Sequence, residues 1–278
     1  MKITLSNLHT HSTFCDGKNT PEEIVLAAID KGFSSIGFSG HGYTPYDLRY
    51  CMKDTEGYIS EIERLKVKYA DKITLLLGIE EDAFAPVDRA RFDYIIGSSH
   101  YYLVGGKYYP IDSSYDHFKK CLEIFEYDAV RMAEVYYGSF YDYLKARKPD
   151  IVGHYDLITK FDELDESLFL KNAKYREIAE DYALKIADLG CMFEVNTGAI
   201  TRGMRTTPYP SEHLLHALKK QDVRLILSSD SHTVETLDGA FEETADYLYD
   251  IGFRHIYIPS AAGFRPYSLK KSYVTSND

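Results

Sequence analysis

Histidine and carboxylate side chains recur where successive strand candidates end, and this pattern limits the folds open to the chain. Short apolar runs of strand length alternate with longer amphipathic runs. The strand candidates are Ile3–His9, Ser35–His41, Ile73–Asp82, Tyr94–His100, Ile151–His154, Met192–Thr197, Arg224–Asp230 and His255–Ile258. Such alternation predicts an α/β protein whose parallel sheet is either closed into a barrel or open and doubly wound. Neither GxGxxG nor GxxxxGK[ST] follows the first candidate, which disfavours nucleotide-binding folds.

Local signals support this division of the chain. Thr20-Pro21-Glu22-Glu23 combines a capping box with proline at the first helical position, and Gly32 ends the predicted helix. Ser211 precedes a second helix with a leucine stripe. The segment 101–110 holds two adjacent glycines among aromatic residues, which predicts a hairpin.

Composition narrows the class of protein. The 278 residues, 45% of them hydrophobic, suit one domain over residues 1–278 with a substantial core. No apolar run is long enough to span a bilayer, and the chain enters its first motif without room for a signal peptide, so we expect a cytoplasmic protein without a membrane partner. The four cysteines are far apart and are expected to be reduced thiols. A net charge of −11 argues against nucleic acid as the main partner. Oligomeric state is left open.

The strand-end residues are expected to meet at one place. Side chains at positions i and i+2 of a strand share a face, so His9 and His11 can point together, as can Asp230 and His232. In a barrel the C-terminal strand ends surround one mouth. Imidazole and carboxylate groups gathered there suit Zn, Fe or Mn ions. The histidines and carboxylates at these strand ends are His9, His11, Asp16, His41, Glu80 with its neighbours Glu81 and Asp82, His100, His154, Asp230 and His232.

Glu80 has two acidic neighbours, and strand alternation separates them. Glu80 and Asp82 share one face with Gly78, whereas Leu77 and Ile79 share the other. Because the apolar face should pack against the outer helices, Glu80 is expected to point into the barrel. Glu81 is the weaker candidate ligand.

These residues carry a resemblance to a known family. His9-Thr10-His11, Asp16-Gly17, His41, Gly78-Ile79-Glu80, His100, Gly153-His154 and Asp230-Ser231-His232 resemble the ordered motif set of the PHP (polymerase and histidinol phosphatase) family. The resemblance implies a distorted (β/α)7 TIM-like barrel with three metal ions. It implies one ion held by His9, His11, Glu80 and Asp230. Glu80 would bridge to a second ion held by His100 and His154, and Asp16, His41 and His232 would hold the third.

Further segments resemble the histidinol-phosphatase branch of that family. They are the segment 193–198 with Arg202, Arg205 and Tyr209-Pro210 after it, and the segment 153–161. The branch implies hydrolysis of L-histidinol phosphate to L-histidinol and phosphate in histidine biosynthesis. Arg202, Lys160 and Arg205 are predicted to bind the substrate phosphate. For the amine and imidazole of the substrate, Asp82, Tyr101 and Tyr102 are candidate neighbours, and none of them stands out.

The expected reaction is in-line attack on phosphorus by a metal-bridging hydroxide, with Glu80, Asp230 and His232 among the catalytic groups. Another phosphoesterase of the family, acting on a small nucleotide or phosphotyrosine, is the principal alternative. A binding protein on a degenerate barrel and a metal-dependent amidohydrolase are two further hypotheses. The first normally lacks some ligands, and the second normally uses a strand-end lysine, which is absent from the inner candidates here.

Overall fold

Seven parallel strands form the centre of the molecule in the computed structural model, which describes residues 6–164, 168–260 and 263–271. Their order is β1-β2-β3-β4-β7-β8-β9. The strands are β1 (Ser6–Asn7), β2 (Ser35–Phe38), β3 (Thr74–Asp82), β4 (Tyr94–Ser98), β7 (Ile151–Val152), β8 (Met192–Asn196) and β9 (Leu225–Ser228). Just beyond β1 and β9, the N–H of His11 donates to the carbonyl of Ser231 at 2.8 Å and the N–H of Ser231 to the carbonyl of His9 at 3.1 Å. These bonds bring the first and last strands together, so the barrel is nearly closed.

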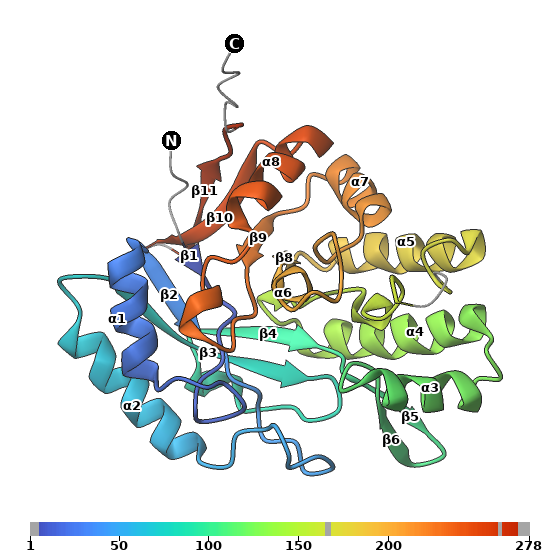
Figure 1. The fold of residues 1–278 in the computed structure, drawn as a ribbon, viewed down its shortest axis with the longest axis horizontal. Coiled ribbons are helices and arrows are strands. Elements are labelled where there is room, and N and C mark those ends of the chain that lie inside the picture. The colour runs from blue at the N-terminus through green and yellow to red at the C-terminus, as the bar shows by residue number, and fades with distance from the viewer. Residues whose placement is uncertain (1–5, 165–167, 261–262, 272–278) are drawn as a thin grey trace.

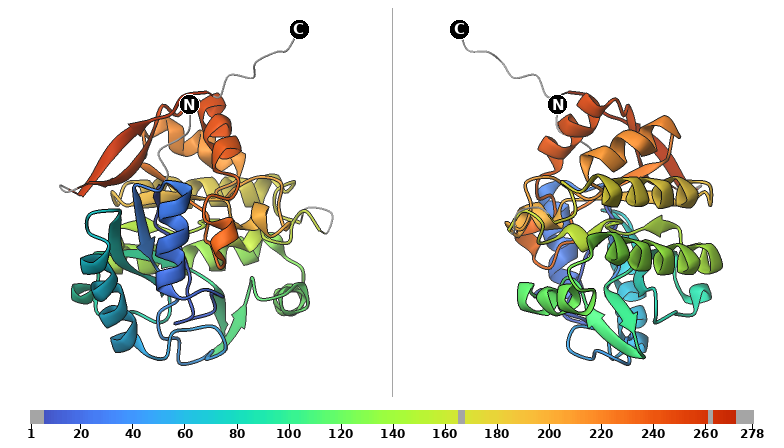
Figure 2. Two further views of the ribbon diagram at one scale, coloured as in Figure 1. Left: turned by 60° about the vertical axis from the view of Figure 1, so that its left-hand side comes forward. Right: turned by 90° about the vertical axis from the view of Figure 1, so that its right-hand side faces the viewer.

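Helices surround this barrel (Figures 1 and 2). On one side lie α1 and α2, and α4, α5, α7 and α8 follow around the other strands. The helices are α1 (Pro21–Lys31), α2 (Thr55–Lys68), α3 (Tyr115–Ile124), α4 (Ala129–Arg147), α5 (Ala173–Ala187), α6 (Gly198–Thr201), α7 (Glu212–Lys220) and α8 (Phe241–Ile251). Between β3 and β4 the described chain makes only a 3-10 turn, Arg89–Arg91, which distorts the regular strand–helix alternation. The predicted distorted (β/α)7 barrel is confirmed.

The local predictions are also confirmed, except that the last strand candidate lies outside the barrel sheet. Thr20 and Glu23 form the reciprocal capping box of α1, and Gly32 ends that helix with a φ of 81°. The predicted hairpin is present as β5 (Tyr101–Val104) and β6 (Lys107–Pro110). The last strand candidate is extended but does not join the barrel. It forms β10 (His255–Ser260), which pairs antiparallel with β11 (Gly263–Ser268) in a separate ribbon (Figure 2).

Several strands end earlier than predicted. The described part of β1 is Ser6–Asn7, and residues 3–5 of that prediction lie outside the described residues. β2, β4, β7 and β9 each stop two or three residues before the histidine or aspartate that closed the predicted strand. These side chains therefore lie on the short segments that follow the strands. Of the nine candidate ligands, Glu80 alone is within a strand of the described sheet.

The core has two parts. The larger part lies between the sheet and the helices, and a smaller one fills the barrel interior with Leu8, Tyr94, Ile96, Ile151, Met192 and Ile226. Tyr257 of β10 and Phe264 of β11 pack against this interior cluster, which lies toward the N-terminal ends of the strands. The β10–β11 ribbon therefore covers the end of the barrel opposite the candidate ligands. Within the described ranges, no helix has the length and apolar character needed to cross a bilayer.

The ring of Tyr94 leaves no room for a side chain at Gly78 in the barrel interior. A Cβ atom at Gly78 would lie 2.2 Å from that ring. We expect Gly78→Ala to lower the free energy of unfolding by about 3 kcal/mol, because the overpacked ring has no free space to enter. The matched control is Gly138→Ala in α4, where a Cβ would lie 3.3 Å from the hydroxyl of Tyr182. There the helix preference for alanine should keep the change within about 1 kcal/mol. Denaturant unfolding measures both, and equal effects would contradict the packing argument.

Candidate metal centre

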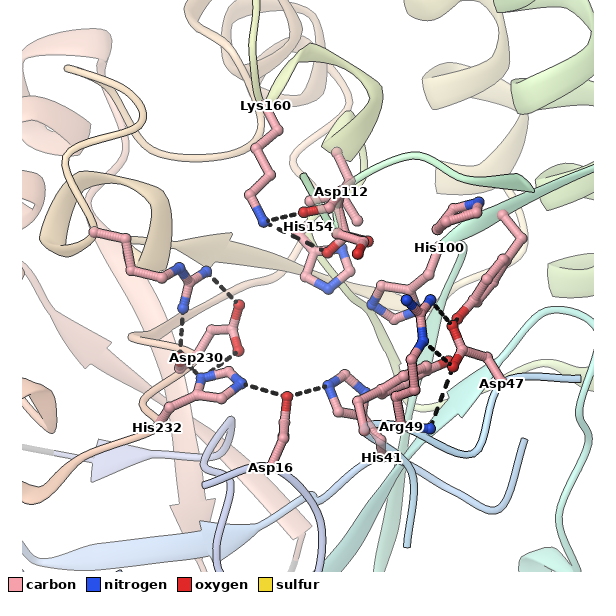
Figure 3. Close-up of a pocket in the computed structure, with 16 residues that line it drawn as sticks. Asp16, His41, Asp47, Arg49, His100, Asp112, His154, Lys160, Asp230 and His232 are labelled. Atoms are coloured by element: carbon pink, nitrogen blue, oxygen red, sulfur yellow. Dashed lines mark hydrogen bonds and ion pairs between the residues drawn. The ribbon is translucent and has the colours of Figure 1, made fainter. Parts of the chain in front are cut away.

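All nine candidate ligands lie together at the C-terminal mouth of the barrel (Figure 3 labels six of them). Glu80 on β3 is at the centre, and its side chain is 1% exposed. Its Oε2 atom faces three imidazole nitrogens: Nδ1 of His41 at 2.8 Å, Nε2 of His9 at 3.3 Å and Nε2 of His11 at 3.7 Å. Its Oε1 atom faces two more: Nε2 of His154 at 2.9 Å and Nε2 of His100 at 3.3 Å.

Two aspartates complete the cluster on the side of His11. Oδ1 of Asp230 lies 3.0 Å from Nε2 of His11 and 3.7 Å from Nε2 of His9. Asp16 lies between three imidazoles, at 3.4 Å from Nε2 of His232, 3.6 Å from Nδ1 of His11 and 3.7 Å from Nε2 of His41. His11 therefore faces a different carboxylate with each ring nitrogen.

Unpartnered buried atoms test whether this cluster suits metal ions. Nε2 of His9, Nε2 of His11 and Oε2 of Glu80 have no hydrogen-bond partner among the described residues. A buried polar atom without a partner ordinarily costs about 1–3 kcal/mol. One donor atom each from His9, His11 and Glu80 lies within 4.8 Å of the other two, and the same holds for one donor atom each from His11, Asp16, His41 and His232. Groups of nitrogen and oxygen donors that face a common point fit cations of the Zn, Fe or Mn type.

The pKa values in the metal-free cluster follow from its charges. Burial disfavours the charged imidazole of His9, but the carboxylates of Glu194, Glu80 and Asp230 outweigh it and raise the pKa well above the usual value. Burial and the neighbouring imidazoles of His232 and His41 instead lower the pKa of His11 to about 3. His11 is therefore neutral near pH 7, the state in which imidazole binds a metal.

Glu194 on β8 is a buried carboxylate that the candidate ligands did not include. Its Oε1 lies 2.6 Å from Nδ1 of His9 and also accepts from the hydroxyl of Ser228. Its Oε2 accepts from the N–H of His154 at 2.7 Å and from the side chain of Asn196 at 3.0 Å. A carboxylate on one ring nitrogen of a histidine directs the other nitrogen toward a metal. Strand alternation, which puts two polar residues on one face of an otherwise apolar strand, is the signal that could have identified Glu194.

Three residues were considered as neighbours of the amine and imidazole of the substrate, and two of them, Asp82 and Tyr102, are hydrogen-bonded to other parts of the protein. Asp82 accepts hydrogen bonds from the N–H of His100 and from the hydroxyl of Tyr46, and its Oδ2 lies 3.1 Å from Nδ1 of His100. It therefore orients His100 as Glu194 orients His9. Tyr102 is 1% exposed and donates to the carbonyl of Met132 in the core. Tyr101 does line the cavity above the cluster.

The predicted phosphate-binding residues are in two places. Arg202 and Lys160 line a cavity of about 340 Å³ over the cluster. Arg202 donates to the carbonyl and to Oδ2 of Asp230, both at 3.0 Å, and Lys160 donates to the carbonyl of Asp112 at 2.7 Å. The structure does not bring Arg205 to this cavity. Its side chain is fully buried, donates to the hydroxyls of Thr159 and Ser211, and lies 3.8 Å from Asp156.

The role of Glu194 can be separated from a merely structural one. We expect Glu194→Gln to weaken metal binding about 10- to 100-fold, because the amide fixes the ring of His9 less well than a carboxylate. Titration of the metal-free protein with Zn²⁺ or Mn²⁺ measures this. The control is Asp162→Asn, a buried carboxylate that accepts from the N–H groups of Phe169 and Leu170 and is not among the candidate ligands. It should lower stability and leave metal affinity unchanged. Unchanged affinity in Glu194→Gln would refute the positioning role.

Comparisons with known proteins agree with this geometry. Residues 7–198 match the PHP domain family. A protein of Schizosaccharomyces pombe named probable histidinol-phosphatase is 30% identical, over 88% of this chain and 86% of its own. One of Deinococcus radiodurans with the same name is 26% identical, over 91% and 95%.

A solved structure shares the fold. Histidinol phosphate phosphatase of Lactococcus lactis, in complex with zinc, L-histidinol and phosphate, superposes with a TM-score of 0.71 at 21% identity. The match covers 95% of this chain and 100% of that one. The family match covers more than half of the chain and the S. pombe relative spans most of it, so this chain belongs to the PHP domain family.

Proposed function

We propose that this protein is a metal-dependent phosphomonoesterase that hydrolyses L-histidinol phosphate to L-histidinol and phosphate in histidine biosynthesis. The observation that carries the proposal is the convergence of nine imidazole and carboxylate side chains under a cavity with Arg202 and Lys160 on its wall. The names of the two relatives and the ligands of the L. lactis structure support the choice of substrate.

Three groups of ligands suit three ions. We assign His9, His11, Glu80 and Asp230 to the first ion, Glu80, His100 and His154 to the second, and Asp16, His41 and His232 to the third. Glu80 can serve two ions because its oxygens face different histidines. His41 lies at the junction, since Nδ1 faces Glu80 and Nε2 faces Asp16. Bound ions would supply the hydroxide that attacks phosphorus near neutral pH and the positive charge that phosphoryl oxygens need.

The protein itself contributes cationic side chains. The guanidinium of Arg202 bonds to Asp230 through Nη1 and Nη2, so it is held at the edge of the cluster, where a phosphoryl oxygen could reach it. Lys160 approaches from another wall of the cavity, and its side chain is 15% exposed. Phosphate monoesters resist hydrolysis in water, so fixed positive charge around the phosphoryl group should lower the barrier. Arg205 is left out of this set because it does not reach the cavity.

The test combines metal analysis with a substrate comparison. Phosphate release is measured for L-histidinol phosphate, a nucleoside monophosphate and phosphotyrosine, in wild type, Asp230→Asn and Arg202→Ala. We expect bound metal, preference for L-histidinol phosphate, and kcat/KM lower by about 100-fold in Arg202→Ala. Arg64→Ala on α2, outside the cavity, is the matched control. Metal-dependent turnover of another ester would mean that the proposed substrate is wrong while the phosphoesterase activity stands. If the protein held no metal and released no phosphate, the proposal that it is an enzyme would be overturned.

A further inference from the structure

The cavity over the metal ligands holds two carboxylates that are not among those ligands. They are Asp47, on the segment after β2, and Asp112, on the segment between β6 and α3. A phosphate ester is an anion, so carboxylates on the wall of its cavity would repel it unless they serve another part of the substrate. The two carboxylates differ in the hydrogen-bond partners that they already have.

Asp47 is occupied. Its Oδ1 accepts from the N–H and Nε of Arg49 at 3.2 and 2.8 Å, and its Oδ2 accepts from Nη2 of Arg49 and from the hydroxyl of Tyr101 at 3.0 Å. Both oxygens therefore have partners, and the charge is balanced by a guanidinium. Asp47 holds Arg49 and Tyr101 in place on that wall.

The carboxylate of Asp112 is open to the cavity. It accepts no hydrogen bond from the described residues, and its nearest cation is Nζ of Lys160, 3.6 Å from Oδ2. Nζ of Lys160 instead donates a hydrogen bond to the main-chain carbonyl of Asp112, at 2.7 Å. The side chain of Asp112 is 27% exposed. In the view of Figure 3, Asp112 and Lys160 lie beside His154, on the side of the cavity away from Asp16 and His232.

Lys160 and Asp112 thus present a positive and a negative group side by side. A substrate with matching neighbouring charges carries a phosphate and, a few bonds away, an ammonium group. We infer that Asp112 is the specificity-determining residue that accepts the ammonium group of an amino-alcohol phosphate, while Lys160 and Arg202 face its phosphate. This inference rests on the proposed function and deepens it, because it says why an aminated ester is chosen over a plain one.

Two substrates that differ only in the amino group measure its contribution to recognition. L-histidinol phosphate is compared with the analogue in which hydrogen replaces the amino group, imidazolylpropyl phosphate, in wild type and Asp112→Asn. We expect Asp112→Asn to lower kcat/KM for the aminated ester about 10- to 100-fold, the effect of one charge-assisted hydrogen bond, and to leave the analogue nearly unchanged. Wild type should prefer the aminated ester by a similar factor.

Product inhibition gives a second readout that needs no modified ester. In Asp112→Asn, inhibition by L-histidinol should weaken by a similar factor, while inhibition by inorganic phosphate should not change. Asp47→Asn is the matched control, because the same substitution on the occupied carboxylate should leave the ratio of the two substrates unaltered. If Asp112→Asn does not fold, Asp112→Ser is tested in its place, and thermal unfolding checks both variants.

The outcomes separate this inference from the proposed function. An equal loss with both esters, or weaker inhibition by phosphate, would mean that Asp112 only positions Lys160, and would overturn the amine subsite while leaving the phosphatase intact. Metal-loaded wild type that hydrolyses neither ester would overturn the proposed function itself. Selective loss of the amine preference in Asp112→Asn alone would establish the subsite.

Discussion

Glu80→Gln is expected to lower kcat by about 1,000-fold or more and to reduce the number of metal ions that the protein retains. The reason is the position of the carboxylate among five imidazoles. Oε2 faces His9, His11 and His41, and Oε1 faces His100 and His154. Glutamine keeps one acceptor oxygen and replaces the other by an NH₂ group, which cannot bind a cation. The variant can therefore serve one side of the cluster at most.

The neighbouring glutamate provides the control for this prediction. Glu81 points to the other face of β3, where it accepts from the hydroxyl of Tyr143, from Arg147 and from the N–H of Val87. Glu81→Gln removes the same charge one residue away and should reduce stability without changing the metal content. Metal analysis after gel filtration and steady-state kinetics measure both variants. Full metal occupancy and near-normal kcat in Glu80→Gln would refute the bridging role.

The grouping of the candidate ligands at one place could be predicted because it depends on strand direction and residue type. Parallel strands bring their C-terminal ends to one mouth, so His9, His41, His100 and His154 could be grouped before any contact was known. Alternation along β3 correctly separated Glu80 from Glu81. Strand lengths were less accurate, since the turns that follow each strand decide where pairing stops.

The second layer of the site could not be predicted in the same way. Strand alternation can place Glu194 and Asp82 on the inner faces of their strands, but the roles of these two residues and of Asp112 depend on partners that are distant in sequence. Arg205 shows the reverse case: its type and position suggested a phosphate contact, but packing turned it toward Asp156 and Ser211. Residue type alone does not distinguish a cation that faces a cavity from one that balances a buried carboxylate. β10 differs from its predicted role because extended conformation does not specify which strand will be its neighbour.

Removal of the metal ions is expected to destabilise the folded protein strongly. Without cations, Nε2 of His9, Nε2 of His11 and Oε2 of Glu80 are buried with no hydrogen-bond partner among the described residues, and only the surrounding imidazoles and Arg202 balance the buried carboxylates of Glu80 and Asp230. For an ion present at 1,000 times its Kd, the lost free energy is about 4 kcal/mol. We therefore expect a chelator to lower Tm by about 10 °C or more, as measured by differential scanning calorimetry. Addition of Zn²⁺ or Mn²⁺ should restore Tm, and Glu80→Gln should respond much less.

Metal binding should also depend on pH in a defined direction. Burial opposes protonation of His9, His41 and His100, but the carboxylates around them outweigh it and raise each pKa above the usual value. These imidazoles therefore keep their protons to a higher pH than a free histidine does in the metal-free protein, and an ion must displace any proton that they hold. Binding should release protons, and affinity should increase as the pH rises. Calorimetric titration in two buffers of different ionisation enthalpy counts the protons. An affinity that does not change between pH 6 and 8 would show that these imidazoles are already neutral before the ion arrives.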